Sequence, residues 1–173
     1  MHPFHPFWSL EAPRVDGQLL LTPCPGTQQV PLTLALDQLR LAGAHGVVTL
    51  MTTAELTRLE LAHLGQQVEH EGMRWFHLPI ADDQAPDANF DLAWQQALPA
   101  MCELLGDGKH LVIHCKGGSG RTGLVAAALL MTLGQPQTEA VAAIQANRPK
   151  AFKLAAHRQW LDQLAERLDA ATD

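Results

Sequence analysis

Short apolar runs alternate along the chain with segments that have helical periodicity. Runs of β-branched and other apolar residues, typical of buried strands, occupy residues 18–22, 46–51, 74–80 and 110–114. Elsewhere, hydrophobic residues recur every three or four positions, which predicts helices over residues 32–42, 54–70, 90–105, 121–133, 138–148 and 151–170. Strands and helices alternate in the middle of the chain, so we expect a single-domain α/β fold with a central, mostly parallel sheet flanked by helices.

Local signals mark several helix ends. Thr52 followed three residues later by Glu55 is a capping-box pattern, which predicts a helix that begins at residue 54. This helix would extend towards residue 70, with Gly65 as the expected position of any break. Thr138 is the expected cap of a later helix. The segment after residue 121 is apolar on nearly all sides, which indicates a helix enclosed by other elements.

The first 16 residues differ from the rest because they carry three prolines and no clear period. We expect residues 1–16 to form an irregular or packed-on arm. Residues 17–173 would then form the folded domain.

The length and charge of the chain exclude several classes of protein. A chain of 173 residues suits one domain. Its formal net charge of −6 argues against a nucleic-acid-binding surface or a polybasic membrane anchor, because both need clustered Lys and Arg. No apolar run approaches the roughly 20 residues that span a bilayer, and the first residues lack the pattern of a secretory signal. We therefore expect a cytoplasmic protein without nucleic-acid or membrane partners.

The cysteines and histidines give no sign of a metal centre. Cys24, Cys102 and Cys115 are scattered without C-x-x-C spacing, so neither a disulfide framework nor a zinc site is indicated. The nine histidines lack ligand spacing as well. We therefore predict no metal and no cofactor. Buried packing is the ordinary role for Cys24 and Cys102, and a disulfide with an oxidised Cys115 is the alternative.

The segment VIHCKGGSGRTG, residues 112–123, has the composition of an anion-binding loop. A strand that ends at His114 leads into a glycine-rich turn, and a helix begins near Arg121. Backbone N–H groups of such a turn, together with the free N–H groups of the helix start, form a cradle for a phosphate group. The residues that would bind phosphate in this way are Lys116, Gly117, Gly118, Ser119, Gly120 and Arg121.

Cys115 and Arg121 stand at the two ends of this loop. The field of the cradle stabilises a thiolate, so Cys115 would be a nucleophile at neutral pH. The planar guanidinium of Arg121 could bind two phosphate oxygens in the ground state and the transition state. Two other interpretations are a small buried cysteine and a nucleotide-binding loop. The second would require the pattern G-x-x-x-x-G-K-[ST], which the segment lacks.

The pattern His114-Cys115-x5-Arg121-Thr122 resembles the H-C-x5-R-[ST] signature of the cysteine-dependent protein tyrosine and dual-specificity phosphatases. Within that superfamily, residues 77–87 and 112–130 are similar to the kinase-associated phosphatase group, also described as cyclin-dependent kinase inhibitor 3-like. The likeness extends over roughly residues 18–165.

This resemblance implies a two-step reaction through a phosphocysteine intermediate. Cys115 would attack phosphorus, a general acid would protonate the leaving oxygen, and Thr122 would hydrogen-bond the sulfur and ease its departure. The group places the acid in an Ile-Ala-Asp sequence, which matches Asp82. Asp83 stays an alternative, because it and its neighbour stand where the group usually has glycines. Asp87 is a third carboxyl in the same loop, and all three could simply cap the next helix.

The predicted substrate is a phosphorylated protein, carrying phosphotyrosine and also phosphoserine or phosphothreonine. Two alternatives stay open. The loop also resembles that of a lipid phosphatase, HCKAGKGRTG, of whose two lysines only the first is present here, as Lys116, with Ser119 at the second position. That leaves a phosphoinositide or other small-molecule phosphomonoester as a substrate. The third interpretation is a phospho-binding adaptor without turnover.

Overall fold

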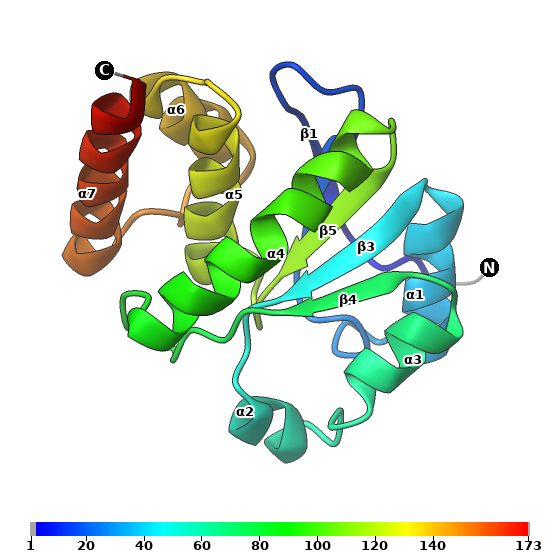
Figure 1. The fold of residues 1–173 in the computed structure, drawn as a ribbon. Helices are drawn as coiled ribbons and strands as arrows, with labels where there is room; N and C mark the ends of the chain where they lie inside the picture. Colours follow the sequence, from blue (N-terminus) through cyan, green and yellow to red (C-terminus); the bar gives the residue numbers. More distant parts are fainter. Residues whose placement is uncertain (1–2, 173) are drawn as a thin grey trace.

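The protein folds around one five-stranded sheet with the strand order β1-β2-β5-β3-β4 (Figure 1). The structure is a computed structural model that describes residues 3–172. Its strands are β1 (Trp8–Glu11), β2 (Gln18–Thr22), β3 (Ala44–Thr49), β4 (Arg74–His77) and β5 (His110–His114). Only the β1–β2 pair in this sheet is antiparallel. The predicted α/β fold with a mostly parallel central sheet is confirmed.

Helices cover both faces of the sheet. They are α1 (Leu32–Leu41), α2 (Thr53–Arg58), α3 (Leu64–His70), α4 (Ala88–Gly106), α5 (Gly120–Thr132), α6 (Gln137–Asn147) and α7 (Ala155–Thr172). One hydrophobic cluster joins α1 and α3 to one face, and a larger one joins α4, α5 and α7 to the other. Figure 1 shows these two layers, with α2 beside the carboxyl ends of the strands. No helix within residues 3–172 is long and apolar enough to cross a membrane.

The predicted capping box forms, and it starts a shorter helix than expected. The hydroxyl of Thr52 accepts from the Glu55 N–H at 3.2 Å, and a Glu55 carboxylate oxygen accepts from the Thr52 N–H at 3.1 Å. The chain leaves the helical path over residues 59–63, so the break expected at Gly65 is wrong. Gly65 lies inside α3, where a β-carbon would come within 2.4 Å of the Trp75 ring. This glycine serves close packing.

Two other expected helix starts are wrong. α6 begins at Gln137 with Pro136 at the cap position and no side-chain cap, so Thr138 does not have the predicted role. The fixed φ of proline near −60° suits the turn into the helix, and Thr138 lies inside the first turn of α6, past the cap position. The last helix begins at Ala155, because residues 151–154 form turns after α6.

The N-terminal arm contributes an edge strand that its sequence did not indicate. Trp8–Glu11 forms β1 and pairs with β2, with Trp8 opposite Leu21. Pairing to a neighbour can order a segment that has no periodicity of its own. The division into an arm, 1–16, and a domain, 17–173, stays a prediction. The first two residues of that arm and residue 173 lie outside the described residues.

The loop after β5 is anchored rigidly at both ends. β5 lies between β2 and β3 in the middle of the sheet. α5 is buried from Arg121 to Met131, as its apolar sequence predicted. A loop between two such elements is held by the core, which fixes the positions of its backbone N–H groups.

Candidate active site

Cys115 lies at the bottom of the loop between β5 and α5, with 4% of its surface exposed. Its sulfur accepts two hydrogen bonds, from the Gly118 N–H at 3.3 Å and from the Thr122 hydroxyl at 3.1 Å. Both donors stabilise negative charge on sulfur. The first turn of α5 thus brings Thr122 to the position that the sequence predicted for it.

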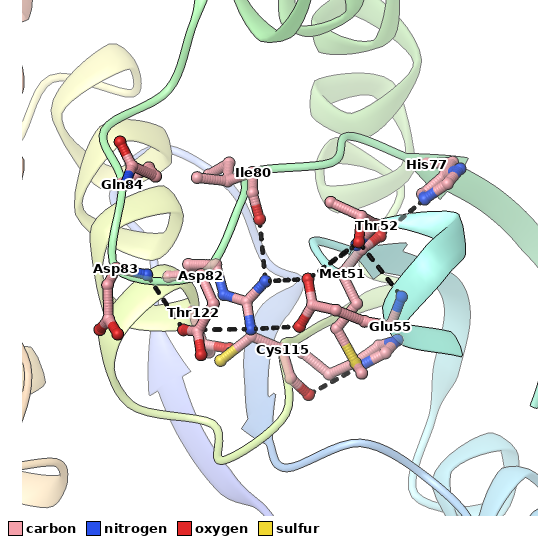
Figure 2. Close-up of polar contacts among 12 residues, drawn as sticks. Met51, Thr52, Glu55, His77, Ile80, Asp82, Asp83, Gln84, Cys115 and Thr122 are labelled. Carbon is pink, nitrogen blue, oxygen red and sulfur yellow. Dashed lines mark hydrogen bonds and ion pairs between the residues drawn. The ribbon is translucent and has the colours of Figure 1, made fainter. Parts of the chain in front are cut away.

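Arg121 is almost fully buried, with 3% of its surface exposed, and is held by a pair of parallel hydrogen bonds to Glu55. Nη1 donates to Oε1 at 2.7 Å and Nη2 donates to Oε2 at 2.9 Å (Figure 2). Nη1 also donates to the Ile80 carbonyl at 2.8 Å. Within residues 3–172, Nε has no hydrogen-bond acceptor. The guanidinium is therefore fixed on one side and keeps donors for an anion on the other.

Glu55 is a site residue that the sequence analysis missed. Burial alone would raise the pKa of Glu55, but hydrogen bonds from Arg121 and Thr52 outweigh burial and lower it. The carboxylate thus stays charged and keeps its pair with Arg121. A signal was present, because the capping box puts Glu55 in the first turn of a helix directly after β3. Carboxyl ends of parallel strands meet at one edge of a sheet, which is the edge where Cys115 lies.

The three carboxyls of the loop after β4 have different surroundings. Asp82 lies beside Arg121, with Oδ1 at 3.5 Å from Nη2 and 64% of its side chain exposed. Asp83 has a left-handed backbone (φ 60°), and Figure 2 shows its side chain pointing away from Cys115. Asp87 caps α4 by accepting from the Phe90 N–H at 2.9 Å. Only Asp82 among them contacts the buried arginine.

His114 fixes the backbone at Cys115. Nδ1 lies 3.1 Å from the Cys115 carbonyl, and Nε2 lies 2.7 Å from the Thr49 hydroxyl. Because a carbonyl only accepts, Nδ1 must carry the proton, and Thr49 then donates to Nε2. Burial lowers the pKa of His114 to about 4, so the ring is neutral at physiological pH. This agrees with an orienting role and gives no route for proton transfer.

The remaining loop residues have different roles in the geometry. Lys116 and Gly117 are exposed, while Gly118 is buried. Gly118 has a φ of 78°, and a β-carbon there would come within 2.6 Å of the Pro23 backbone. A β-carbon at Gly117 or Gly120 would meet nothing within 4 Å. Among these three glycines, Gly118 is therefore the one whose backbone conformation and close packing exclude a side chain.

A second arginine contacts the outer side of the loop. Arg148, directly after α6, donates to the carbonyls of Gly117 and Gly118 and to the hydroxyl of Ser119. These three hydrogen bonds give Arg148 a role in holding the loop, in addition to its place at the end of α6. The loop after β4 is held in a similar way, because His157 Nε2 lies 2.8 Å from the Gln84 carbonyl.

Of the two other thiols, Cys24 lies next to the loop, since its N–H donates to the Lys116 carbonyl at 3.0 Å, and Cys102 lies on α4. Cys24 is fully buried, and burial, with smaller contributions from Cys115 and Glu55, raises its pKa to about 12. Cys102 is half-buried on α4, where burial also raises its pKa. All three cysteines are free thiols. Within residues 3–172, no group of three or more His, Cys, Asp and Glu side chains is arranged to hold a metal ion.

A cavity of about 260 Å³ adjoins the buried arginine pair. It lies between α2 and the loop of residues 115–119 that joins β5 to α5, called the phosphate loop below. Its lining residues are Met51, Glu55, Arg58, Leu59, Asp82 and Lys116. Two of these, Arg58 and Lys116, are exposed cations. The cavity therefore offers room next to the site, and its walls carry two cations and the two carboxylates of Glu55 and Asp82.

A mostly parallel sheet, a glycine-rich loop after its central strand, and a cysteine and a buried arginine at the ends of that loop define the class of the cysteine-dependent phosphatases. Residues 26–135 match the family described as "Polymorphic toxin system, DSP-PTPase phosphatase". The chain belongs to this family, and with it to the superfamily of protein tyrosine and dual-specificity phosphatases.

Individual relatives agree with this assignment. "Cyclin-dependent kinase inhibitor 3" of Rattus norvegicus is 31% identical over 97 residues, which cover 56% of this chain and 44% of that protein. The chain thus spans less than half the length of this curated relative. The resemblance to the kinase-associated phosphatase group that the sequence suggested is confirmed.

Two solved structures share the fold. Kinase-associated phosphatase, crystallised with its catalytic cysteine replaced by serine, has a TM-score of 0.85 at 22% identity and covers 98% of this chain and 99% of that chain. PTPMT1 in complex with PI(5)P has a TM-score of 0.71 at 23% identity and covers 90% of this chain and 94% of that chain.

Proposed function

We propose that the protein hydrolyses phosphomonoesters of phosphorylated proteins through a cysteinyl-phosphate. The observation that carries this proposal is the surroundings of Cys115. Its sulfur receives an amide N–H and a hydroxyl, and the neighbouring guanidinium of Arg121 keeps donors for an anion. This is the arrangement that a thiolate nucleophile and a bound phosphoryl group require.

The first step transfers the phosphoryl group to sulfur. The phosphoryl oxygens bind the inward N–H groups of residues 116–120 and the guanidinium of Arg121. The thiolate of Cys115 attacks phosphorus, and the bond between phosphorus and the ester oxygen breaks. Asp82, which lies at 3.5 Å from the guanidinium of Arg121, gives its proton to the leaving oxygen. The product alcohol or phenol then departs.

The second step returns the enzyme to its starting state. Water attacks phosphorus, and the Asp82 carboxylate takes one of its protons. The phosphorus–sulfur bond breaks, and Cys115 leaves as a thiolate that the Thr122 hydroxyl stabilises at 3.1 Å. Inorganic phosphate is released. Both steps use backbone N–H groups and side chains of the protein, together with water.

Relatives support a protein substrate. Those matched here are described as cyclin-dependent kinase inhibitor 3 and, in Invertebrate iridescent virus 3, as a putative tyrosine phosphatase. We infer phosphotyrosine as a substrate, together with phosphoserine and phosphothreonine, because the family model is that of a dual-specificity phosphatase. A cytoplasmic location stays a prediction.

A multiply phosphorylated small molecule is the second candidate substrate. The cavity beside Arg121 carries Arg58 and Lys116, two cations that could bind a second phosphate group of the same molecule. PTPMT1, which shares the fold, is known in complex with PI(5)P. The exposed Arg58 and Lys116 favour this candidate. No contact within residues 3–172 favours a phospho-binding adaptor without turnover.

Hydrolysis of p-nitrophenyl phosphate tests the proposal. Cys115→Ser should lose all measurable turnover and still bind inorganic phosphate, because the loop amides and Arg121 stay in place. Asp82→Asn should lower kcat by roughly 10²- to 10⁴-fold, the usual contribution of a general acid. Asp83→Asn is the matched control and should change kcat less than threefold. Turnover that survives in Cys115→Ser would refute the nucleophile.

A substrate panel separates the two candidates. It contains phosphotyrosine, phosphoserine and phosphothreonine peptides and soluble inositol phosphates, compared by kcat/KM. Preference for the peptides supports the protein phosphatase. Preference for the inositol phosphates supports the small-molecule phosphatase and rejects the first candidate.

A further inference from the structure

The outer side of the phosphate loop is held by one guanidinium. Arg148 Nε donates to the Gly118 carbonyl at 3.0 Å, and Nη2 donates to the Gly117 carbonyl at 2.9 Å and to the Ser119 hydroxyl at 2.8 Å. These contacts join Arg148, which follows α6, to a loop about thirty residues earlier in the chain. A planar fork that binds two successive carbonyls sets the orientation of both peptide units.

These two peptide units carry N–H groups of the anion cradle. In a trans peptide the C=O and N–H point in opposite directions. In the peptide between Gly117 and Gly118, the carbonyl of Gly117 accepts a hydrogen bond from Arg148. The N–H of Gly118 points the other way and donates to the Cys115 sulfur at 3.3 Å. By the same geometry, the next peptide turns the Ser119 N–H inward. Arg148 therefore aims two amide donors at the position of the thiolate and the phosphoryl group.

Arg148 is itself fixed by the N-terminal arm. Its guanidinium carbon lies 4.0 Å from the centre of the Trp8 ring, a close cation–π contact. Trp8 begins β1 and is held opposite Leu21 of β2. A guanidinium on a flexible side chain has many orientations, and an aromatic face restricts them to those parallel or nearly parallel to the ring.

A second contact of the arm supports the same part of the loop. His5 is buried, and its Nε2 lies within hydrogen-bond distance of the Thr22 hydroxyl and 3.1 Å from the Pro23 carbonyl. The backbone at these two residues is where Gly118 approaches most closely. The arm thus contacts the cradle from two sides, through Arg148 and through the end of β2.

Neither Trp8 nor Arg148 falls within the residues that match the family, 26–135. The matched part contains the cradle and its chemistry and leaves out both of these supports. We propose that Trp8 is a positioning residue for the reaction, acting through Arg148: it fixes the guanidinium that turns the Gly118 and Ser119 N–H groups towards the phosphoryl group. The inference about catalysis rests on the proposed function, but the effect on anion binding does not.

Binding of inorganic tungstate, a phosphate-like oxyanion, measures the cradle without any turnover. The probe is titrated against the full chain, and protection of Cys115 from iodoacetamide gives its affinity. Trp8→Ala should weaken tungstate binding about fivefold, the range expected for loss of a cation–π contact. Trp8→Phe keeps an aromatic face and should stay within twofold of wild type. Phe4→Ala, at an exposed position of the same arm, is the control and should also stay within twofold.

A double-mutant cycle shows whether Trp8 acts through Arg148. Arg148→Ala should weaken tungstate binding about tenfold or more, since two amide donors lose their orientation. Adding Trp8→Ala to Arg148→Ala should cause no further loss. Arg148→Lys keeps the charge without the fork and should bind almost as weakly as Arg148→Ala.

Three results would overturn the proposal. They are wild-type affinity in Trp8→Ala, equal loss in Trp8→Phe and Trp8→Ala, and additive losses in the double variant. Thermal unfolding of each variant identifies any that fails to fold. If Trp8→Ala is unfolded, Trp8→Leu replaces it, because leucine fills apolar space without offering an aromatic face. If the wild-type protein binds tungstate and hydrolyses no phosphomonoester, the proposed function fails while the role of Trp8 in anion binding is still decided.

Discussion

At the scale of single residues, the pair between Arg121 and Glu55 decides how the site presents its positive charge. Two parallel hydrogen bonds hold the guanidinium from the side of α2. A long side chain that is otherwise free would lose entropy when it binds phosphate, and this pair removes that cost in advance. The capping box adds a second constraint, because the same carboxylate oxygen also accepts from Thr52. One residue thereby links the start of α2 to the anion site.

Replacing Glu55 should therefore affect catalysis more than its distance from the sulfur suggests. Glu55→Gln keeps the size and a hydrogen-bond acceptor but loses the charge, and we expect kcat/KM for p-nitrophenyl phosphate to fall about tenfold. Glu55→Ala leaves the buried arginine without its partner, so a further loss and a destabilisation of about 3 kcal/mol should follow. Glu69→Gln, at an exposed position of α3, is the control. Equal kinetics in Glu55→Gln and wild type would mean that Arg121 needs no carboxylate.

At the scale of elements, the sequence predicts what local patterns determine. β5 was predicted with its observed bounds, because an apolar run of five residues is too short for a helix and long enough for a buried strand. The break between α2 and α3 was misplaced, because Gly65 serves close packing against the Trp75 ring of β4 and does not end a helix. The cap position of α6 falls on Pro136, two residues before the expected cap at Thr138. Tertiary packing overrides local signals at these positions.

The same reasoning separates the site residues. Residues 115–122 form one segment, so the sequence alone could group them, and their catalytic roles stay predictions. Glu55 and Arg148 come from distant elements and meet the loop only through the topology of the sheet. No local pattern carries such a contact, although the capping box identified the helix start that positions Glu55.

Helix α5 allows a test of packing against propensity. At Gly123 a β-carbon would lie 2.7 Å from the β-carbon of Ala151 and 3.3 Å from an Ile144 methyl group. Alanine favours helices over glycine by about 1 kcal/mol, so propensity alone predicts that Gly123→Ala is stabilising. We expect the clash to win and the variant to be destabilised by about 1–3 kcal/mol, as overpacked cores usually are.

Gly106 is the matched control, because it ends α4 and a β-carbon there meets nothing within 4 Å. Gly106→Ala should be neutral or stabilising by up to about 1 kcal/mol. Urea unfolding measures both variants. A stabilised Gly123→Ala would show that α5 and the segment around Ala151 have space to move apart.

At the scale of the whole molecule, buried neutral histidines tie the stability of the fold to pH. His114 lies where β5 meets β3, and burial lowers its pKa to about 4. His5 joins the arm to the end of β2, and burial lowers its pKa as well. Both groups bind a proton more readily in the unfolded chain, where the pKa of histidine is about 6.5.

The sign of the effect follows from this difference. Above about pH 6.5 both states carry neutral histidine, and stability is at its full value. As the pH falls towards 4, the unfolded chain takes up protons that the folded protein refuses, so the free energy of unfolding decreases. For His114 alone the loss between pH 7 and pH 5 should be about 2 kcal/mol, with His5 adding to it. Glu55, whose pKa is lowered from 4.5, contributes only at lower pH.

Urea unfolding at several pH values between 7 and 5 measures this loss. His114→Asn keeps a polar group that can contact Thr49 but cannot bind a proton in this range, so its free energy of unfolding should vary less with pH than that of wild type. His70→Asn, on the exposed side of α3, should keep the wild-type dependence. Because His114 also orients the Cys115 carbonyl, p-nitrophenyl phosphate hydrolysis by His114→Asn would fall at pH 7 as well. A pH-independent wild-type stability would mean that the histidines take up protons equally in the folded and the unfolded protein, which would contradict their burial.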